Sequence, residues 1–146
     1  TAEKNGFENF SFVTGRLQDF SKEYNGKFSL VLCNPPYETG GFENERYEKA
    51  ICRKEIEITL EEIVKAAKRA LKFGGRFALC HKASRAAEAI AALDRNGFAV
   101  KRMQFVSGSP AAQPYLVLIE AVYGGKPGTE VLPVLVNTAK TGATTD

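Results

Sequence analysis

Apolar residues recur with strand-like spacing in several separate stretches of the chain. Residues 10–13 alternate apolar and polar positions and are rich in strand-forming types, which predicts a first strand. The apolar run from Phe28 to Cys33 is continuous rather than alternating, as in a strand that is covered on both faces of a parallel sheet. Further strands are predicted over residues 76–80, 98–106 and 115–123, with a short edge strand over 131–136.

A helix is predicted between the second and third of these strands. Thr59 and Glu62 have the spacing of a capping box, and an apolar helical stripe follows them. The stripe consists of Leu60, Ile63, Val64, Ala67 and Leu71. We expect Gly74-Gly75 to end this helix, because glycine readily adopts the left-handed conformation that closes helices.

A second, Ala-rich helix is predicted from Ser84, its N-cap, to Asn96, with Gly97 as its stop. Residues 1–6 are typical of a helix end closed by Gly6, and residues 47–51 fit a short helix. The order of elements predicts an open α/β sheet, parallel at first, whose last two strands pair as an antiparallel hairpin.

Composition bounds the class of protein. The 146 residues include 44% hydrophobic types, enough for the core of one domain, and 20 Lys+Arg against 17 Asp+Glu give a net charge of +3. The basic excess lies within residues 74–146, where a solvated surface is favoured over a polyanion site on composition alone. No apolar run approaches the roughly 20 residues that cross a bilayer, so we expect a cytoplasmic protein without a membrane partner.

The cysteines and the histidine restrict the chemistry. Cys33, Cys52 and Cys80 form no CxxC pair, and His81 is the single histidine, so neither a disulfide framework nor a metal site is supported. A nucleophilic pair of His81 with one cysteine stays open as an alternative. Cys33 and Cys80 end apolar runs, which favours buried strand residues, and His81 is expected to be a hydrogen-bonded structural residue.

The candidate site is Asn34-Pro-Pro-Tyr37, which follows the strand Phe28 to Cys33. In an open α/β sheet the ligand crevice lies beyond the carboxyl ends of the strands. Asn34 offers an amide donor and acceptor, Pro35 a carbonyl and Tyr37 a flat ring, which suits a planar amide or an amino-substituted base. The alternative interpretation is a rigid turn with a buried tyrosine.

The run from Phe28 to Tyr37 resembles the fourth strand and catalytic motif of S-adenosylmethionine-dependent amino-group methyltransferases. Four further segments narrow the resemblance to the tRNA N6-adenine methyltransferases that modify an adenosine beside the anticodon of a valine tRNA. These segments are Cys52-Arg-Lys-Glu55, residues 71–77, His81 and residues 124–128. The resemblance covers nearly the whole chain, and it implies a Rossmann-like class I methyltransferase sheet, mostly parallel with a terminal antiparallel hairpin.

The resemblance implies that Asn34, Pro35, Pro36 and Tyr37 form the catalytic motif. The Asn34 side chain and the Pro35 carbonyl would accept hydrogen bonds from the exocyclic amine and direct its lone pair toward the sulfonium methyl of S-adenosylmethionine. Asn34 would also contact this cofactor. Pro36 supports the geometry of the motif, and Tyr37 would stack on an adenine that has left its own stack.

The resemblance also suggests cofactor and tRNA contacts. An acidic residue often stands near Arg16 in this family and helps hold the cofactor's adenine, and Asp19 is the candidate substitute. Basic residues would hold the phosphates of tRNA. The candidates are Arg53, Lys54, Lys82, Lys101 and Arg102. Lys101 and Arg102 also fit a solvated strand edge.

A glycine-rich Gly-x-Gly loop after a first strand and an acidic residue ending a second strand are absent from the sequence. We therefore expect residues 1–136 to be the C-terminal portion of a methyltransferase domain, inactive alone, and 137–146 to be a polar tail. Two strand-helix units, roughly 60–80 residues, would be missing, and the exposed sheet edge would favour self-association. Two alternatives stay open: a release-factor glutamine N5-methyltransferase, and a non-catalytic RNA- or protein-binding half-domain.

Overall fold

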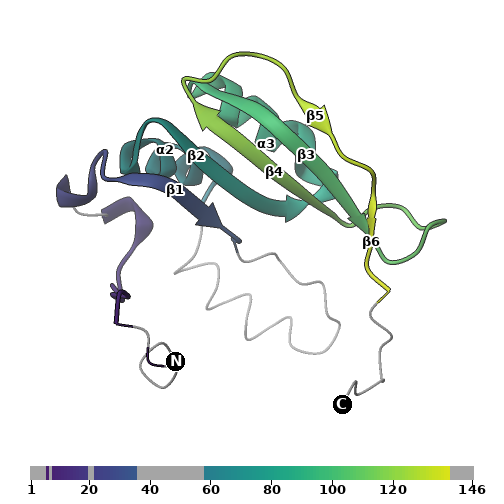
Figure 1. Cartoon of the computed structure of the whole chain (residues 1–146), viewed down its shortest axis with the longest axis horizontal. Helices are drawn as coiled ribbons and strands as arrows, with labels where there is room; N and C mark the ends of the chain where they lie inside the picture. The colour runs from purple at the N-terminus through teal and green to yellow at the C-terminus, as the bar shows by residue number, and fades with distance from the viewer. Residues whose placement is uncertain (1–5, 7, 20–21, 36–57, 139–146) are drawn as a thin grey trace.

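The described part of the chain forms a twisted sheet with helices α2 and α3 on one of its faces (Figure 1). A computed structural model describes residues 6, 8–19, 22–35 and 58–138. The strands within these residues are β1 Phe28–Cys33, β2 Leu71–Lys82, β3 Phe98–Ser107, β4 Leu116–Tyr123, β5 Glu130–Val131 and β6 Leu135–Val136. The helices are α2 Leu60–Ala70 and α3 Ala86–Arg95, and the 3-10 turns are η1 Leu17–Asp19, η2 Lys22–Tyr24 and η3 Ala83–Arg85. None of these helices has the length and apolar run that crossing a membrane requires.

The strand order across the sheet is β1-β2-β4-β3-β5, and β6 also pairs with β3. β1 and β2 are parallel, β4 is antiparallel to both β2 and β3, and β5 and β6 are parallel to β3. Every described strand except β4 therefore points the same way, which confirms the predicted mostly parallel sheet and its antiparallel β3–β4 hairpin. The single predicted edge strand over 131–136 is instead two short strands, β5 and β6, along β3.

Helix α2 begins at the predicted capping box. The Glu62 backbone N–H donates to Thr59 Oγ1 at 3.2 Å, and the Thr59 N–H donates to the Glu62 carboxylate at 2.8 Å. The predicted end was wrong, because α2 ends at Ala70 and Gly74-Gly75 lies inside β2. Leu71 is already paired with Phe28, and the next pair joins Leu30 to Arg76, so residues 72–75 bulge out of the ladder. Gly74 supplies the positive φ of +84° that this bulge needs.

Two other predicted details were also wrong. Ser84 does not cap α3, because the chain first makes the 3-10 turn η3 and the helix N-cap is Arg85, without a side-chain cap bond. Gly97, with φ +83°, does follow the C-cap residue Asn96, as predicted. Residues 10–13 form no strand, and Phe12 is 80% exposed. Alternation alone does not make a strand where no neighbouring strand pairs with it.

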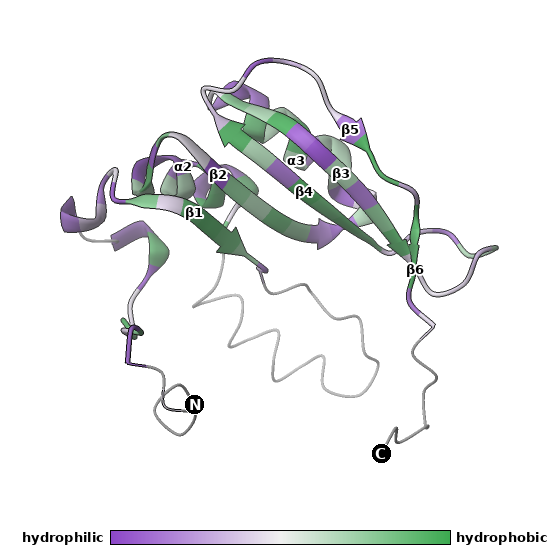
Figure 2. Ribbon diagram, viewed as in Figure 1, coloured by the Kyte–Doolittle hydropathy of each residue, from purple (hydrophilic) through white to green (hydrophobic). Residues whose placement is uncertain are grey.

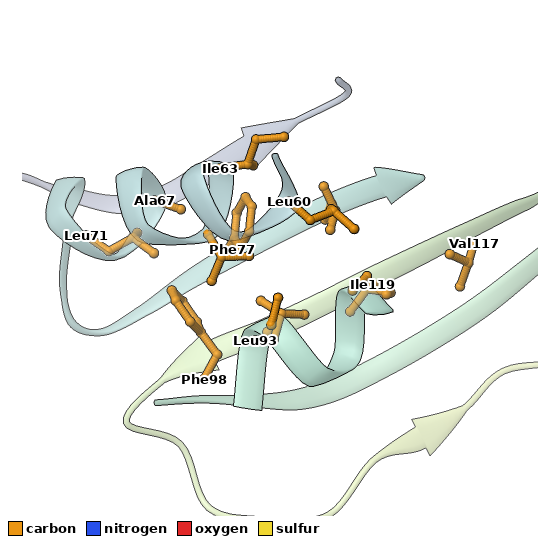
Figure 3. Packing of buried hydrophobic residues seen from close by; sticks show 14 residues of the cluster. Leu60, Ile63, Ala67, Leu71, Phe77, Leu93, Phe98, Val117 and Ile119 are labelled. Carbon is orange, nitrogen blue, oxygen red and sulfur yellow. The ribbon is translucent and has the colours of Figure 1, made fainter. Parts of the chain in front are cut away.

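The core lies between the sheet and the helices. Phe77 of β2 and Val117 and Ile119 of β4 point toward α2 and α3, where they meet Leu93 and Ile63 (Figure 3). Phe77 is 1% exposed. The predicted helix over 47–51 lies outside the described residues, as do residues 1–5 of the helix end predicted over 1–6 and residues 139–146 of the tail predicted over 137–146.

Candidate functional site

The two faces of the sheet differ in what covers them. Side chains alternate between the faces, so the residues between those of the core point to the face opposite α2 and α3, which we call the open face. The strand register joins Leu32 to Ala78, Ala78 to Glu120 and Glu120 to Arg102 in one row across this face. Figure 2 shows that β1, β2 and β4 are mostly hydrophobic along their length, with hydrophilic positions among them.

A groove of about 620 Å³ runs along the open face from the end of β1 to β3. It is lined by Leu32, Cys33, Asn34, Ala78, Leu79, Cys80, Arg102, Met103, Gln104, Leu118, Ile119, Glu120 and Leu132. Asn34, an exposed residue, stands at the carboxyl end of β1, where the sequence predicts the ligand crevice, and Pro35 behind it is buried. Pro36, Tyr37, Arg53 and Lys54, which are also predicted site residues, lie outside the described residues.

An ion cluster crosses the groove. The Glu120 carboxylate accepts from Arg76 Nη1 at 3.4 Å and from Arg102 Nη2 at 2.5 Å. The Glu120 side chain is 21% exposed, less than either arginine, so the carboxylate lies on the floor and the guanidinium groups rise around it. The hydrogen bond that Arg102 donates to the Glu120 carboxylate raises the pKa of Arg102 above its ordinary value. This cluster was not predicted from the sequence, although a lone glutamate inside the apolar run 115–123 is a signal that could have indicated it.

The predicted tRNA-contact residues are partly engaged within the protein. Arg102 binds Glu120, and Lys101 Nζ donates to the backbone carbonyl of Lys126 at 3.0 Å. Lys82 is the last residue of β2, at the same edge of the sheet as Asn34. The structure therefore puts Lys82 and Arg102 near the groove, and their contacts with tRNA stay predictions.

Arg16 and Asp19 are the predicted cofactor contacts before β1. They flank or end η1, which contacts α2, and Leu17 of η1 packs against the core. Leu17 also lines an apolar hollow of about 320 Å³ between α2 and β1, with Ala66 and Ala70. Neither Arg16 nor Asp19 lines the groove, and their cofactor contacts stay predictions.

The surroundings of His81 and Cys33 bear on whether these residues act as nucleophile and base. His81 is 7% exposed, and its Nδ1 accepts from the Lys82 backbone N–H at 2.8 Å. Burial, followed by the charges of Arg85 and Lys82, holds the pKa of His81 below its ordinary value, so the imidazole is neutral near pH 7. Burial raises the pKa of the Cys33 thiol, which disfavours the thiolate that a nucleophile needs. No cluster of metal-binding side chains occurs among the described residues.

Comparison with known proteins bears on the fold. No protein-family model and no curated protein matches the chain. A solved structure of Atu636 from Agrobacterium tumefaciens, described as a predicted O-methyltransferase, matches with a TM-score of 0.56 and 20% identity over 82% of this chain and 47% of that one. M1.HpyAVI, solved as a complex with SAM, matches with a TM-score of 0.49 and 15% identity over 84% of this chain and 62% of that one.

The chain thus spans about half the length of Atu636. At this level of identity the likeness bears on the fold alone. Together with the strand order β1-β2-β4-β3, it confirms the predicted class, a Rossmann-like class I methyltransferase sheet.

Proposed function

We propose that the chain is the catalytic portion of an S-adenosylmethionine-dependent N-methyltransferase that acts on the exocyclic N6 amine of an adenosine in tRNA. One observation carries the proposal: Asn34 and Pro35 stand at the carboxyl end of β1, at the mouth of a groove, in a sheet of the methyltransferase class. The free thiols suit a cytosolic protein.

The residues at the groove suit this chemistry. An exocyclic amine of a purine is a weak nucleophile, so holding its lone pair toward the methyl group matters more than a strong base. The Asn34 side-chain oxygen and the Pro35 carbonyl would accept its two N–H groups. As the N–C bond forms, the bond between the methyl group and sulfur would break, its electron pair staying on sulfur in S-adenosylhomocysteine. The amine nitrogen would become cationic and then release one proton to water.

The groove also fits the cofactor in size and character. Its volume of about 620 Å³ lies within the usual range for small-molecule sites, and its lining is mostly apolar with a few polar groups, Asn34, Gln104 and the Glu120 cluster. When bound, S-adenosylmethionine supplies a methyl group on a positively charged sulfur. A neutral Cys33 thiol beside Asn34 would not compete with the amine for this methyl group, because thiols are much weaker nucleophiles than thiolates.

We further propose that two strand-helix units precede these residues in the active protein and carry the glycine-rich cofactor loop. The chain's coverage of 47% of Atu636 supports this division. The 146-residue chain alone would then lack methyl transfer. The edge of β1, where Phe28, Leu30 and Leu32 are exposed, would drive self-association of the chain. Light scattering tests this last point, and a monodisperse monomer at high concentration would rule it out.

The substrate class is tested by methyl transfer. The protein with its upstream units is incubated with radiolabelled S-adenosylmethionine and either total tRNA or a translation release factor. We expect label on tRNA, in adenosine. Label on protein alone would replace the proposal with the glutamine methyltransferase, which would use the same four residues on a side-chain amide.

The variant Asn34→Ala separates an enzyme from a binding module. We expect it to abolish methyl transfer while leaving tRNA affinity unchanged, because the amide acts on one amine rather than on phosphates. Gln113→Ala removes another exposed amide, in the loop before β4, and is the matched control. A wild-type protein that binds tRNA but transfers no methyl group would favour the non-catalytic half-domain.

A further inference from the structure

A group of cations gathers at the C-terminal end of α2, on the side of the sheet opposite the groove. Helix α2 contributes Lys65, Lys68 and Arg69, the bulge after it contributes Lys72, and the turn before β1 contributes Lys22 and Lys27. We call these six residues the α2 basic surface. All are exposed except Lys68, which is half-buried.

Backbone hydrogen bonds bring the two segments together. The Gly26 N–H donates to the Arg69 carbonyl at 2.8 Å, and the Lys27 N–H donates to the Ala70 carbonyl at 3.0 Å. These bonds fix the turn that carries Lys22 and Lys27 against the last turn of α2. The cations therefore form one surface, although more than 40 residues separate Lys22 from Lys65 in the sequence.

The acidic residues of α2 do not neutralise this surface. Glu62 is held by the capping box, and Glu61 accepts hydrogen bonds from Arg95 and Asn96 at 2.9 Å, besides a longer contact of 3.8 Å with Lys65. Lys68 lies over the ring of Tyr123. Lys22, Lys27, Arg69 and Lys72 make no ion pair with another described residue. Glu23, in the same turn as Lys22, adds a carboxylate to this surface.

Favourable interaction with the helix dipole explains only part of this arrangement. Cations near a helix C-terminus stabilise the helix, which accounts for Lys68 and Arg69. It does not account for Lys22 and Lys27, which belong to another segment. Basic side chains from two separate segments that lie on one surface without ion pairs are typical of a surface that binds a polyanion.

We propose that the α2 basic surface binds the phosphate backbone of the RNA substrate, at a distance from the reacting base. This inference rests on the proposed function for its choice of polyanion. Lys27 precedes β1 and Asn34 follows it, so the rise of about 3.3 Å per residue separates them by roughly 20 Å. A folded RNA spans such a distance easily, since double-stranded RNA modules contact about 16 base pairs. Phosphate contacts at this surface would set the orientation of the RNA without reading its sequence.

The test measures the affinity of the full chain for fluorescently labelled total tRNA over a series of salt concentrations. We compare Arg69→Gln/Lys72→Gln with Arg85→Gln/Lys126→Gln, which removes the same charge elsewhere. Arg85 is paired with Glu88, and Lys126 lies in the turn after β4. Equal thermal melting of both variants shows that each has folded.

We expect Arg69→Gln/Lys72→Gln to weaken binding roughly five- to tenfold near physiological salt and to reduce the slope of log affinity against log salt by about 1–2. Lys27→Gln should reduce the slope again, and the control should change affinity less than about twofold. Equal effects of the two double variants, or no binding by the wild-type chain, would overturn the proposed surface. Methyl transfer to tRNA is a separate measurement: label on protein alone would overturn the proposed function, whatever the salt dependence of RNA binding.

Discussion

The helix-covered face and the open face of the sheet are built from alternate residues of the same strands, yet they differ in almost every respect. On the covered face Phe77 and Leu93 are essentially inaccessible and belong to one cluster of buried hydrophobic residues. On the open face Leu32 is 72% exposed, and Glu120 holds two arginines across an apolar floor. One face stabilises the fold, and the other carries the candidate chemistry.

Packing on the covered face does not determine which residue types stand at the candidate site on the open face. Asn34 stands at the end of β1 before buried Pro35, whereas Ala78, Leu118 and Glu120 of the groove alternate with core residues along their strands. Substitutions on the open face should therefore change binding while leaving stability nearly intact. Substitutions on the covered face should do the opposite.

The largest expected effect is that of Phe77→Ala. Removing a fully buried ring between α2 and the sheet should lower the free energy of unfolding by about 3–5 kcal/mol, since a cavity remains. Leu32→Ala, at an exposed position of the neighbouring strand, should cost less than about 1 kcal/mol. Urea unfolding followed by circular dichroism measures both, and equal losses would contradict the division into two faces.

A smaller effect is expected at the start of α2. Thr59→Ala removes the oxygen that accepts the Glu62 N–H, and it should lower the free energy of unfolding by about 1 kcal/mol. Thr59→Ser keeps the hydroxyl and should retain most of the stability. If both variants unfold alike, the capping box does not stabilise the helix that covers this face.

The smallest expected effect is a pH dependence from His81, a polar residue on the covered face. Its pKa is below 6.5 in the folded protein, so the unfolded chain binds the proton more readily. This contribution to stability is complete above the unfolded pKa and is lost as the pH falls below it. We expect stability to decrease between pH 7 and 5, with a weaker decrease in His81→Gln. Parallel pH profiles for the two proteins would contradict the assignment.

Many of the helices and strands could be predicted from local hydrophobic patterns, and the wrongly predicted bounds have identifiable causes. Leu71 has the spacing of the apolar stripe of α2, but it pairs with Phe28 in the sheet. A buried apolar residue at this position fits both the end of a helix and the start of a strand, so hydrophobic periodicity does not distinguish them. β4 lies between β2 and β3 in the sheet. This long-range pairing cannot be deduced from the order of the elements along the chain.

The candidate site also has parts that could be predicted from the sequence and parts that could not. Asn34 and Pro35 could be predicted because a short motif ends a strand, and strand ends are where ligands bind in such sheets. The ion pairs of Arg76 and Arg102 with the Glu120 carboxylate could not be predicted from the sequence, because they join three strands across the sheet. The structure places Arg16 and Asp19 at η1, against α2, and their cofactor contacts stay predictions.

The most direct test of the proposed methyltransferase is calorimetric titration with S-adenosylhomocysteine, the product left after methyl transfer. The titration compares the 146-residue chain with the same chain extended upstream by the two proposed strand-helix units. We predict binding by the extended protein and none by the shorter chain. Failure of both to bind would contradict the methyltransferase assignment, and binding by the shorter chain would contradict the placement of the cofactor loop upstream of it.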